Sequence, residues 1–168
     1  MLIDIVYKNM QLSFRNLREE DFDDVISWRS DPVTMQMSRY SGEITKDGFR
    51  PVFNRYLENP SFIVEGKMEN GDLVSVGIIN LTLCLNSSAF QYEIGINFNP
   101  KYRGMRLSKP SLQTFLREYV VDAVPGISNI VADIKQENVA SISLFSGSGF
   151  HQITSKVPGY LRYLHVVL

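Results

Sequence analysis

Apolar residues follow two different spacings along the chain, and the two spacings predict different elements. Short apolar runs and strict alternation favour β-strands, whereas apolar residues three or four positions apart favour helices. Helices are expected at 19–30, 46–58, 111–121 and the first part of 138–150. Strands are expected at 11–17, 61–68, 73–85, 89–98, 128–134, 151–157 and 160–168.

Proline, glycine and polar clusters separate these segments. Acidic residues open the first helix, where they suit the helix dipole, and Pro32 ends this helix or follows its end. Pro51 is expected to interrupt the second helix early. Turn-forming residues predict tight turns at 69–72 and 86–88 and a hairpin around 158–159.

The order of the expected elements indicates a fold class. It runs strand, two helices, three antiparallel strands, helix, strand, helix and two strands. This order predicts an α/β (α+β) fold, with one mixed, mostly antiparallel sheet of about seven strands and helices packed on its faces. No repeat, low-complexity tract or linker divides the chain, so a single domain over residues 1–168 is expected.

Composition narrows the classes of protein that this chain can represent. With 168 residues, 44% of them hydrophobic, it is long enough for one well-packed domain and short for two. A net charge of −1 provides no basic field for nucleic acid. One cysteine and two histidines exclude an intramolecular disulfide and argue against a zinc site, so no metal is expected. Cys84 lies in an apolar run and is expected to be a buried small hydrophobe, not a nucleophile.

Nothing in the sequence points to a membrane. The first ten residues lack the basic segment and the long apolar core of a signal peptide. No apolar run approaches the ~20 residues of a transmembrane helix. We therefore expect a soluble, cytoplasmic protein without a membrane or nucleic-acid partner, and its oligomeric state stays open between monomer and homodimer.

The stretch KYRGMRLSKP at 101–110 lies between an expected strand and an expected helix. A strand that ends in a Gly/Arg loop and opens a helix is a common way to hold a phosphate group. This loop has a single glycine, Gly104, where a phosphate-binding loop usually has two or three. Taken alone, the stretch fits a phosphate loop and an ordinary solvated basic turn equally well.

Longer segments resemble the GNAT superfamily of acyl-CoA-dependent N-acetyltransferases. EIGINFNPKYRGMRLSKPSLQTFLREY and NIVADIKQENVASISLFSGSGF resemble the acyl-CoA-binding core of that family, and the pattern N-x-x-S-x-x-L-F-x-x-x-G-F at 138–150 is the most specific part. SFRNLREEDFDDVISWRSDP resembles its first strand and helix, and IVEGKMENGDLVSVGIINL its central hairpin. WRSDP followed by EIT is most similar to two branches, the ribosomal-protein N-terminal and the bacterial amino-sugar N-acetyltransferases.

The resemblance implies a reaction and a cosubstrate. An acetyl group would pass from acetyl-CoA to a primary amine, such as an amino sugar, a protein N-terminus or a small amine, by direct attack in a ternary complex. The positions that match the cofactor-binding segments of the family are Ile96, Asn97, Phe98, Arg103, Gly104, Met105, Arg106, Leu107, Ser108, Asn138, Ser141 and Phe145.

The loop departs from the family pattern Q/R-x-x-G-x-G/A. Arg103 matches its first position, whereas Arg106 and Ser108 stand where small residues are expected. A positive φ at Arg106 would cost roughly 1–2 kcal/mol. An arginine there could offset that cost by contacting a phosphate directly. Ser108 could serve as the N-cap of the following helix and leave its amides free for an anion.

Alternation along the strand FQYEIGINF puts Glu93, Gly95 and Asn97 on one face, opposite Tyr92 and its apolar neighbours. By resemblance, Glu93 is the general base that deprotonates the incoming ammonium, usually through water. The alternative is a glutamate on a solvated sheet face. The family strand also bulges near its end, at 96–98 here, where backbone amides form an oxyanion hole.

The segment 138–150 carries a match and a departure. Asn138 matches an asparagine that contacts the pantetheine arm, and it can also cap its helix. Phe145 replaces a tyrosine that protonates the leaving thiolate in many relatives. The departure implies a slower enzyme or another donor, such as Ser143, Ser146 or Tyr102, and Phe145 itself fits a plain core position.

Acceptor-binding residues are expected near 28–40 and in the last hairpin. Stacking and charge make five side chains candidates for holding the acceptor: Trp28, Arg29, Arg39, Tyr40 and Tyr160. The alternative is that Trp28 is a core residue and that the arginines form a solvated rim.

Two other functions remain beside the N-acetyltransferase. The irregular loop and Phe145 leave room for a non-catalytic GNAT-fold protein that binds acyl-CoA or works through a partner. An unrelated nucleotide- or phosphate-binding α/β domain is disfavoured, because neither G-K-[ST] nor G-x-G-x-x-G follows any expected strand.

Overall fold

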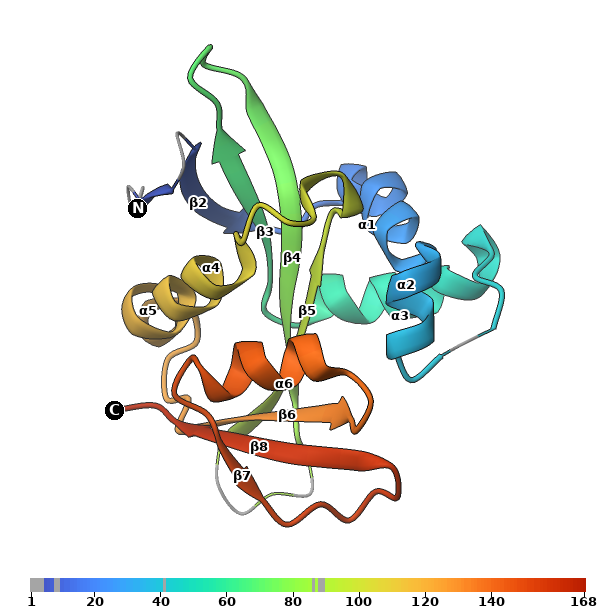
Figure 1. Ribbon diagram of the computed structural model, residues 1–168, viewed down its shortest axis with the longest axis vertical. Helices are drawn as coiled ribbons and strands as arrows, with labels where there is room; N and C mark the ends of the chain where they lie inside the picture. Colours follow the sequence, from blue (N-terminus) through green and yellow to red (C-terminus); the bar gives the residue numbers. More distant parts are fainter. Residues whose placement is uncertain (1–4, 8–9, 41, 86, 88–89) are drawn as a thin grey trace.

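A computed structural model of the chain describes residues 5–7, 10–40, 42–85, 87 and 90–168. Its centre is one eight-stranded sheet with the strand order β1-β2-β3-β4-β5-β6-β8-β7 (Figure 1). The strands are β1 (Ile5–Tyr7), β2 (Met10–Asn16), β3 (Ser61–Lys67), β4 (Leu73–Leu83), β5 (Gln91–Phe98), β6 (Asn129–Lys135), β7 (His151–Ile153) and β8 (Tyr160–Val166). Among these described strands, β5 and β6 are the parallel neighbours and the other pairs are antiparallel.

Helices cover both faces of the sheet. One face carries α1 (Phe22–Arg29), which follows the short 3-10 turn η1 (Glu19–Asp21), together with α2 (Pro32–Met37) and α3 (Lys46–Glu58). The other face carries α6 (Val139–Ser146) and a longer helix made of α4 (Ser108–Thr114), the π-helical η3 (Phe115–Tyr119) and α5 (Val120–Ala123) (Figure 1). In the part of the chain that is described, no helix combines the length and apolar character needed to cross a bilayer.

The predicted fold class is confirmed, with local differences. The sheet gains the short strand β1, which the pattern did not predict. α3 runs through Pro51 without interruption, because the proline lies on the exposed side of the first turns. Pro32 does not merely follow a helix end but occupies the first turn of α2, which Asp31 caps by accepting a hydrogen bond from the Thr34 amide. The predicted turn at 86–88 includes residues outside the described part of the chain.

Two apolar cores, one on each face, explain why the central strands read as continuous apolar runs. Phe62 and Val64 of β3 face the core beneath α4, α5 and α6, whereas Ile63 between them faces the core beneath α1 and α3. In the second core Phe53 of α3 packs edge-on against Phe22 of α1 with ring centroids 5.1 Å apart. Burial on both faces leaves the central strands no polar alternation.

β5 and β6 pair over a short length and then diverge. Their register contains Gln91↔Asn129, Tyr92↔Ile130 and Glu93↔Val131, although β5 continues to Phe98 and β6 to Lys135. β6 instead stays with β8 over its whole length. Figure 1 shows the result: β6 and β8 run across the lower end of β4 and β5. The sheet therefore opens in its middle, on the C-terminal side of Glu93.

A charged network connects the first helix to the sheet. Arg15 of β2 donates through Nη1 and Nη2 to the two carboxylate oxygens of Asp21, at 2.8 and 2.7 Å, and through Nε to Glu65 of β3 at 2.6 Å. Asp21 also accepts a hydrogen bond from the Arg18 amide. Burial alone raises the pKa of Asp21, but the hydrogen bonds from Arg15 and Arg18 outweigh it and hold the pKa below its ordinary value.

We expect Asp21→Asn to lower the free energy of unfolding by about 1–3 kcal/mol at pH 7, because it leaves the partly buried Arg15 guanidinium with one carboxylate fewer. The contribution of Asp21 is fully present above pH about 4 and fades as the pH falls through its lowered pKa. Urea unfolding at pH 7 and under acid conditions measures both effects. Asp23→Asn, which removes an exposed partner of Lys46, is the matched control. Equal free energies of unfolding for the native protein and Asp21→Asn at pH 7 would contradict the prediction.

Candidate functional site

Glu93 lies at the point where the sheet opens. It is the last residue of β5 that pairs with β6. The predicted alternation is confirmed, since Tyr92 and Ile94 are buried in one core while Glu93 points to the other face. Gly95 leaves the backbone beside Glu93 bare, and a Cβ at this position would come within 2.5 Å of the Asn80 side-chain oxygen on the neighbouring strand, so the Asn80 side chain would have to move.

Four further side chains are linked to the Glu93 carboxylate, directly or through Arg39. Arg39, in the segment after α2, donates from Nη2 to Glu93 Oε1 at 2.9 Å and to Asp133 Oδ2 at 3.0 Å. Arg162 of β8 donates from Nε and Nη2 to the two oxygens of Asp133, both at 2.7 Å. The Arg39 guanidinium also lies 5.7 Å from the centre of the Tyr160 ring. We call these five residues the charged cluster.

The electrostatics of the cluster affect Glu93 in a definite direction. Burial raises the pKa of Glu93, and the like charge of Asp133 adds to the rise, whereas Arg39 and Arg162 oppose it. The net result is a pKa above the ordinary value for glutamate. A base with a raised pKa accepts a proton more readily near neutral pH, which suits proton abstraction from an ammonium ion.

The diverging strand β5 leaves its backbone without a β6 partner beyond Glu93. From Ile94 to Phe98 the register among the described strands pairs β5 with β4 alone. The expected bulge at 96–98 is wrong, because the β4–β5 register runs without a shift from Leu83↔Tyr92 to Gly77↔Phe98. The departure of β6, and not a bulge, frees this side of the strand for another hydrogen-bonding partner.

The loop after β5 is held at its start and strained near its end. Asn99 accepts a hydrogen bond from the Lys101 amide and donates one to the Ser75 carbonyl on β4. Gly104 has φ 84° and Arg106 has φ 58°, and Arg106 is the one non-glycine residue with positive φ in the described part of the chain. The left-handed backbone considered for Arg106 is therefore present, at a residue whose side chain is exposed.

Apolar residues anchor the rest of this loop. Leu107 is buried and Met105 packs against the same core, whereas Arg103, Gly104 and Arg106 stay at the surface. Ser108 is not the N-cap of α4: the helix begins at Ser108, and Leu107 precedes it with helical backbone angles and without a side-chain cap. The first amides of α4 consequently have no capping side chain to satisfy them.

Arg103 has a protein partner in this structure. Its Nη2 donates to Asp31 Oδ2 at 2.7 Å, and the same carboxylate caps α2. Burial raises the pKa of Asp31, but the hydrogen bonds from Thr34 and Arg103 outweigh burial and hold the pKa below its ordinary value. The carboxylate therefore stays ionised. Arg103 thus ties the loop to α2 across the open edge of β5.

Helix α6 begins and ends as its sequence suggests. Asn138 accepts a hydrogen bond from the Ser141 amide at 3.1 Å, which confirms it as an N-cap. Phe145 is buried and packs edge-on against Phe150, which confirms its expected core position. Ser146 donates its hydroxyl hydrogen to the backbone of its own helix, to the Ile142 carbonyl at 2.7 Å.

The structure divides the five predicted acceptor residues. Arg39 bonds to Glu93, and Tyr160 lies against the Arg39 guanidinium. Trp28 is only 2% exposed in the core under α1, which is the alternative that the sequence left open. Arg29 is half-buried, and its Nε finds no partner among the described residues. Tyr40 is exposed.

Two members of the charged cluster were missed by the sequence analysis. Asp133 stands in the apolar strand segment 128–134, where it is the one charged residue, and an acidic side chain in such a run is a signal for a buried charge. Arg162 pairs with Asp133 in the β6–β8 register, which one sequence alone cannot supply. Cys84 is half-buried just after β4, less enclosed than expected.

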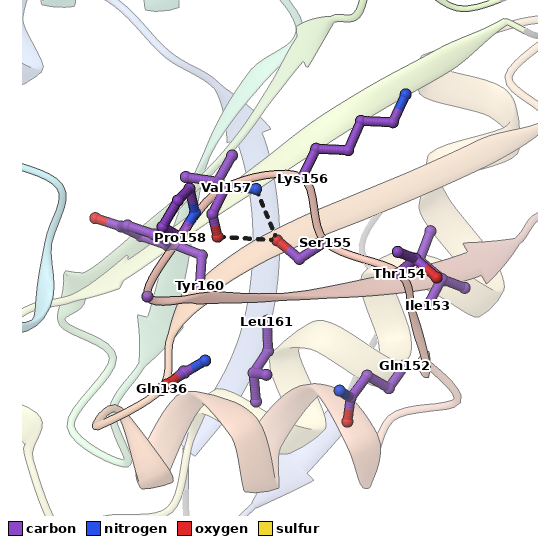
Figure 2. Close-up of a pocket in the computed structure, with 11 residues that line it drawn as sticks. Gln136, Gln152, Ile153, Thr154, Ser155, Lys156, Val157, Pro158, Tyr160 and Leu161 are labelled. Carbon is purple, nitrogen blue, oxygen red and sulfur yellow. Dashed lines mark hydrogen bonds between the residues drawn. The ribbon is translucent and has the colours of Figure 1, made fainter.

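A hollow of about 410 Å³ adjoins the charged cluster at Tyr160. Gln136, Gln152 and the connection between β7 and β8 line it, and the Ser155 hydroxyl hydrogen-bonds to the backbone of Val157 within that connection (Figure 2). Figure 2 shows Leu161 pointing toward α6 and Tyr160 pointing to the other side of β8. The hollow therefore lies beside the cluster and does not contain Glu93.

Comparison with known proteins gives a family and a set of similar folds. The family model described as an acetyltransferase (GNAT) domain matches residues 11–151. A search of curated proteins finds no match. A domain from Methanocaldococcus jannaschii has a TM-score of 0.79 at 21% identity, with 94% of this chain and 99% of that chain covered.

Two further solved structures, both with functional descriptions, are similar to this chain. An acetyltransferase (GNAT family) from Bacillus anthracis has a TM-score of 0.70 at 21% identity, covering 99% of this chain and 98% of that chain. The spermidine N-acetyltransferase from Vibrio cholerae, solved with CoA and spermine, has a TM-score of 0.69 at 16% identity, covering 93% of this chain and 95% of that chain. At these identities the likeness concerns the fold, and the two branches named above remain a prediction.

We expect Arg106→Gly to raise the free energy of unfolding by about 1 kcal/mol, because glycine adopts the left-handed backbone of this position without the Cβ clash. Arg103→Gly is the control, since Arg103 has a negative φ and loses its ion pair with Asp31. Chemical denaturation of the three proteins measures the difference. A lower stability for Arg106→Gly would show that the Arg106 side chain stabilises the loop by more than its backbone strain costs.

Proposed function

The chain belongs to the acetyltransferase (GNAT) family, and on that premise we propose that it transfers an acetyl group from acetyl-CoA to a primary amine, with Glu93 as the general base. The observation that carries the proposal is the position of Glu93, at the vertex where β5 and β6 part. A ligand that enters between the strands passes directly beside this carboxylate. Its raised pKa suits the removal of a proton from an ammonium ion.

The loop and the helix after β5 supply the groups that a pyrophosphate requires. Arg106 is exposed on a strained loop, and the uncapped amides of α4 follow it at Ser108 and Lys109. Backbone amides at a helix start and an arginine together favour a phosphate anion. Arg103 would add a second guanidinium once it leaves Asp31. On the other side of the opening, Asn138 and Ser141 would contact the pantetheine arm at the start of α6.

The chemistry balances with the residues at hand. Glu93 accepts a proton from the acceptor's ammonium, and the free amine attacks the thioester carbonyl carbon. The resulting oxyanion would lie against the β5 backbone at 96–98, whose β6 side is open. When the tetrahedral intermediate collapses, the C–S bond breaks and the sulfur leaves as a thiolate, while the nitrogen of the new C–N bond releases its remaining extra proton to water. Phe145 cannot protonate that thiolate, but a thiol with a pKa of about 8.5 is a tolerable leaving group without such help.

A non-catalytic acyl-CoA-binding protein is the second candidate. The observation in its favour is that Arg39 already pairs with Glu93, so the carboxylate is engaged before any acceptor arrives. Phenylalanine at position 145, which cannot protonate a leaving thiolate, also favours this candidate.

The V. cholerae structure contains CoA and a polyamine on the same fold, which supports an amine acceptor for a protein of this fold.

Isothermal titration with acetyl-CoA and with CoA should give micromolar dissociation constants. Arg106→Ala should weaken both by about tenfold or more, because a charge-assisted contact to phosphate is lost. Arg117→Ala removes an exposed arginine on η3 and is the matched control. If no heat develops up to millimolar acetyl-CoA, neither the enzyme nor the acyl-CoA-binding alternative stands.

Glu93→Gln should lower kcat by about 10²–10⁴-fold in an amine acetylation assay, because glutamine cannot accept the proton. Because the pKa of Glu93 is raised, kcat/KM of the native protein should fall as the pH drops through that pKa, at a higher pH than an ordinary glutamate gives. Glu118→Gln, on the exposed side of η3, is the control for charge. Full activity of Glu93→Gln would assign the base to another residue.

A further inference from the structure

One guanidinium nitrogen lies between two carboxylates at the vertex of the sheet. Arg39 Nη2 is 2.9 Å from Glu93 Oε1 and 3.0 Å from Asp133 Oδ2. A single cationic nitrogen therefore donates to both acids. An ammonium nitrogen in the same place would lie within hydrogen-bond distance of the same two oxygens.

The second carboxylate is fixed in the sheet. The Asp133 side chain is 2% exposed, and Arg162 holds both of its oxygens from the facing position on β8. A bidentate pair of this kind sets both the charge and the orientation of the carboxylate. Asp133 is thus pre-oriented toward the nitrogen beside Glu93, whether or not Arg39 is there.

Arg39 is held more loosely than Arg162. It belongs to the irregular segment between α2 and α3, and 45% of its side chain is exposed. Its ion pairs both involve one nitrogen, and its remaining contact with the cluster is the face of the Tyr160 ring at 5.7 Å. Of the two arginines, Arg39 is the one that can leave without breaking the sheet.

The charges of the cluster show which kind of group must replace Arg39 when it leaves. Glu93 and Asp133 carry two negative charges, and Arg39 and Arg162 carry two positive charges. When Arg39 leaves, one negative charge is uncompensated in a half-buried site, which is costly until another cation enters. The reactive nitrogen of an acceptor amine, protonated in water, is such a cation.

We propose that Arg39 occupies the subsite for the acceptor's ammonium group, that the acceptor displaces it, and that Asp133 is a second carboxylate that positions this ammonium against Glu93. The proposal rests on the proposed function and narrows its substrate class. Aliphatic primary amines, which are cations at pH 7, can take the place of the guanidinium. Arylamines and alcohols are neutral at pH 7 and cannot.

Binding of n-butylammonium tests the subsite without any chemistry. The dissociation constant is measured by NMR titration of the uniformly ¹⁵N-labelled full chain, with tetramethylammonium as a cation that cannot donate hydrogen bonds. If Arg39 fills the subsite nine-tenths of the time, it weakens the apparent affinity about tenfold. Arg39→Gln should therefore bind n-butylammonium about tenfold more tightly than the native protein. Arg117→Gln removes the same charge from the exposed surface of η3 and should bind as the native protein does.

The role of Asp133 is tested in the Arg39→Gln background. Adding Asp133→Asn should abolish the gain in affinity, with the dispersion of the amide spectrum as the check that the chain is folded. Because Asp133 is buried and this variant can unfold, Glu93→Gln in the same background provides a second route to the subsite. Retention of the full gain in either folded double variant overturns the two-carboxylate subsite.

The outcomes separate this inference from the proposed function. Equal affinities of native protein and Arg39→Gln for n-butylammonium, or no binding to either, overturn the inference. If Arg39→Gln gains affinity while no amine is ever acetylated, the subsite stands and the proposed function fails. If amines are acetylated and Arg39→Gln leaves their KM unchanged, the function stands and the inference fails. A lower KM with little change in kcat supports both.

Discussion

The short parallel pairing of β5 with β6 is the constraint on which the rest of the site depends. It stops at Glu93↔Val131, whereas β6 remains paired with β8 for all seven of its residues, from Asn129↔Val166 to Lys135↔Tyr160. β6 therefore follows β8 and leaves β5. One event produces the opening in the sheet, frees one side of the β5 backbone and places Glu93 at the vertex. The connection from β5 to β6 then brings the strained loop and α4 to the same opening.

The strength of each ion pair at the vertex depends on how deeply its carboxylate is buried more than on the number of ion pairs. An exposed pair contributes about 0–1 kcal/mol, and the Arg39–Glu93 pair is of this partly exposed kind. Asp133 is different, because its side chain is almost fully enclosed and would carry a large desolvation cost without Arg162. The cluster thus combines a fixed half, Asp133 with Arg162, and an exchangeable half, Glu93 with Arg39. Such a division suits a site that must hold its geometry and still admit a cation.

Periodicity in the sequence was sufficient for most of the fold. Apolar runs predict strands such as β3 and β4, because both of their faces are buried. The helical spacing of apolar residues predicts α3. Pro51 does not break α3 as expected, because Phe49 and Phe53 on either side of it are buried in one core and hold the helix in place. Ser108 is not the expected N-cap, because the helix begins at Ser108 itself and Leu107 takes the preceding position with helical backbone angles.

The site was harder to predict than the fold, because it is made of contacts between distant strands. Glu93 was found by alternation and resemblance, whereas Asp133 and Arg162 required the β6–β8 register. Arg39 was expected near the acceptor, but its place between two carboxylates depends on how the segment after α2 lies over the sheet. Periodicity and motif spacing along one sequence do not specify either arrangement.

The most direct test of the account is an amide NMR titration of the ¹⁵N-labelled native protein with acetyl-CoA. The account predicts that the largest shift changes fall on three segments around the opening: 94–98 on β5, 103–111 in the loop and α4, and 138–145 on α6. These segments are distant in the sequence and meet only because β5 and β6 diverge. Shift changes confined elsewhere, or none at saturating acetyl-CoA, would contradict the claim that this opening is the cofactor site.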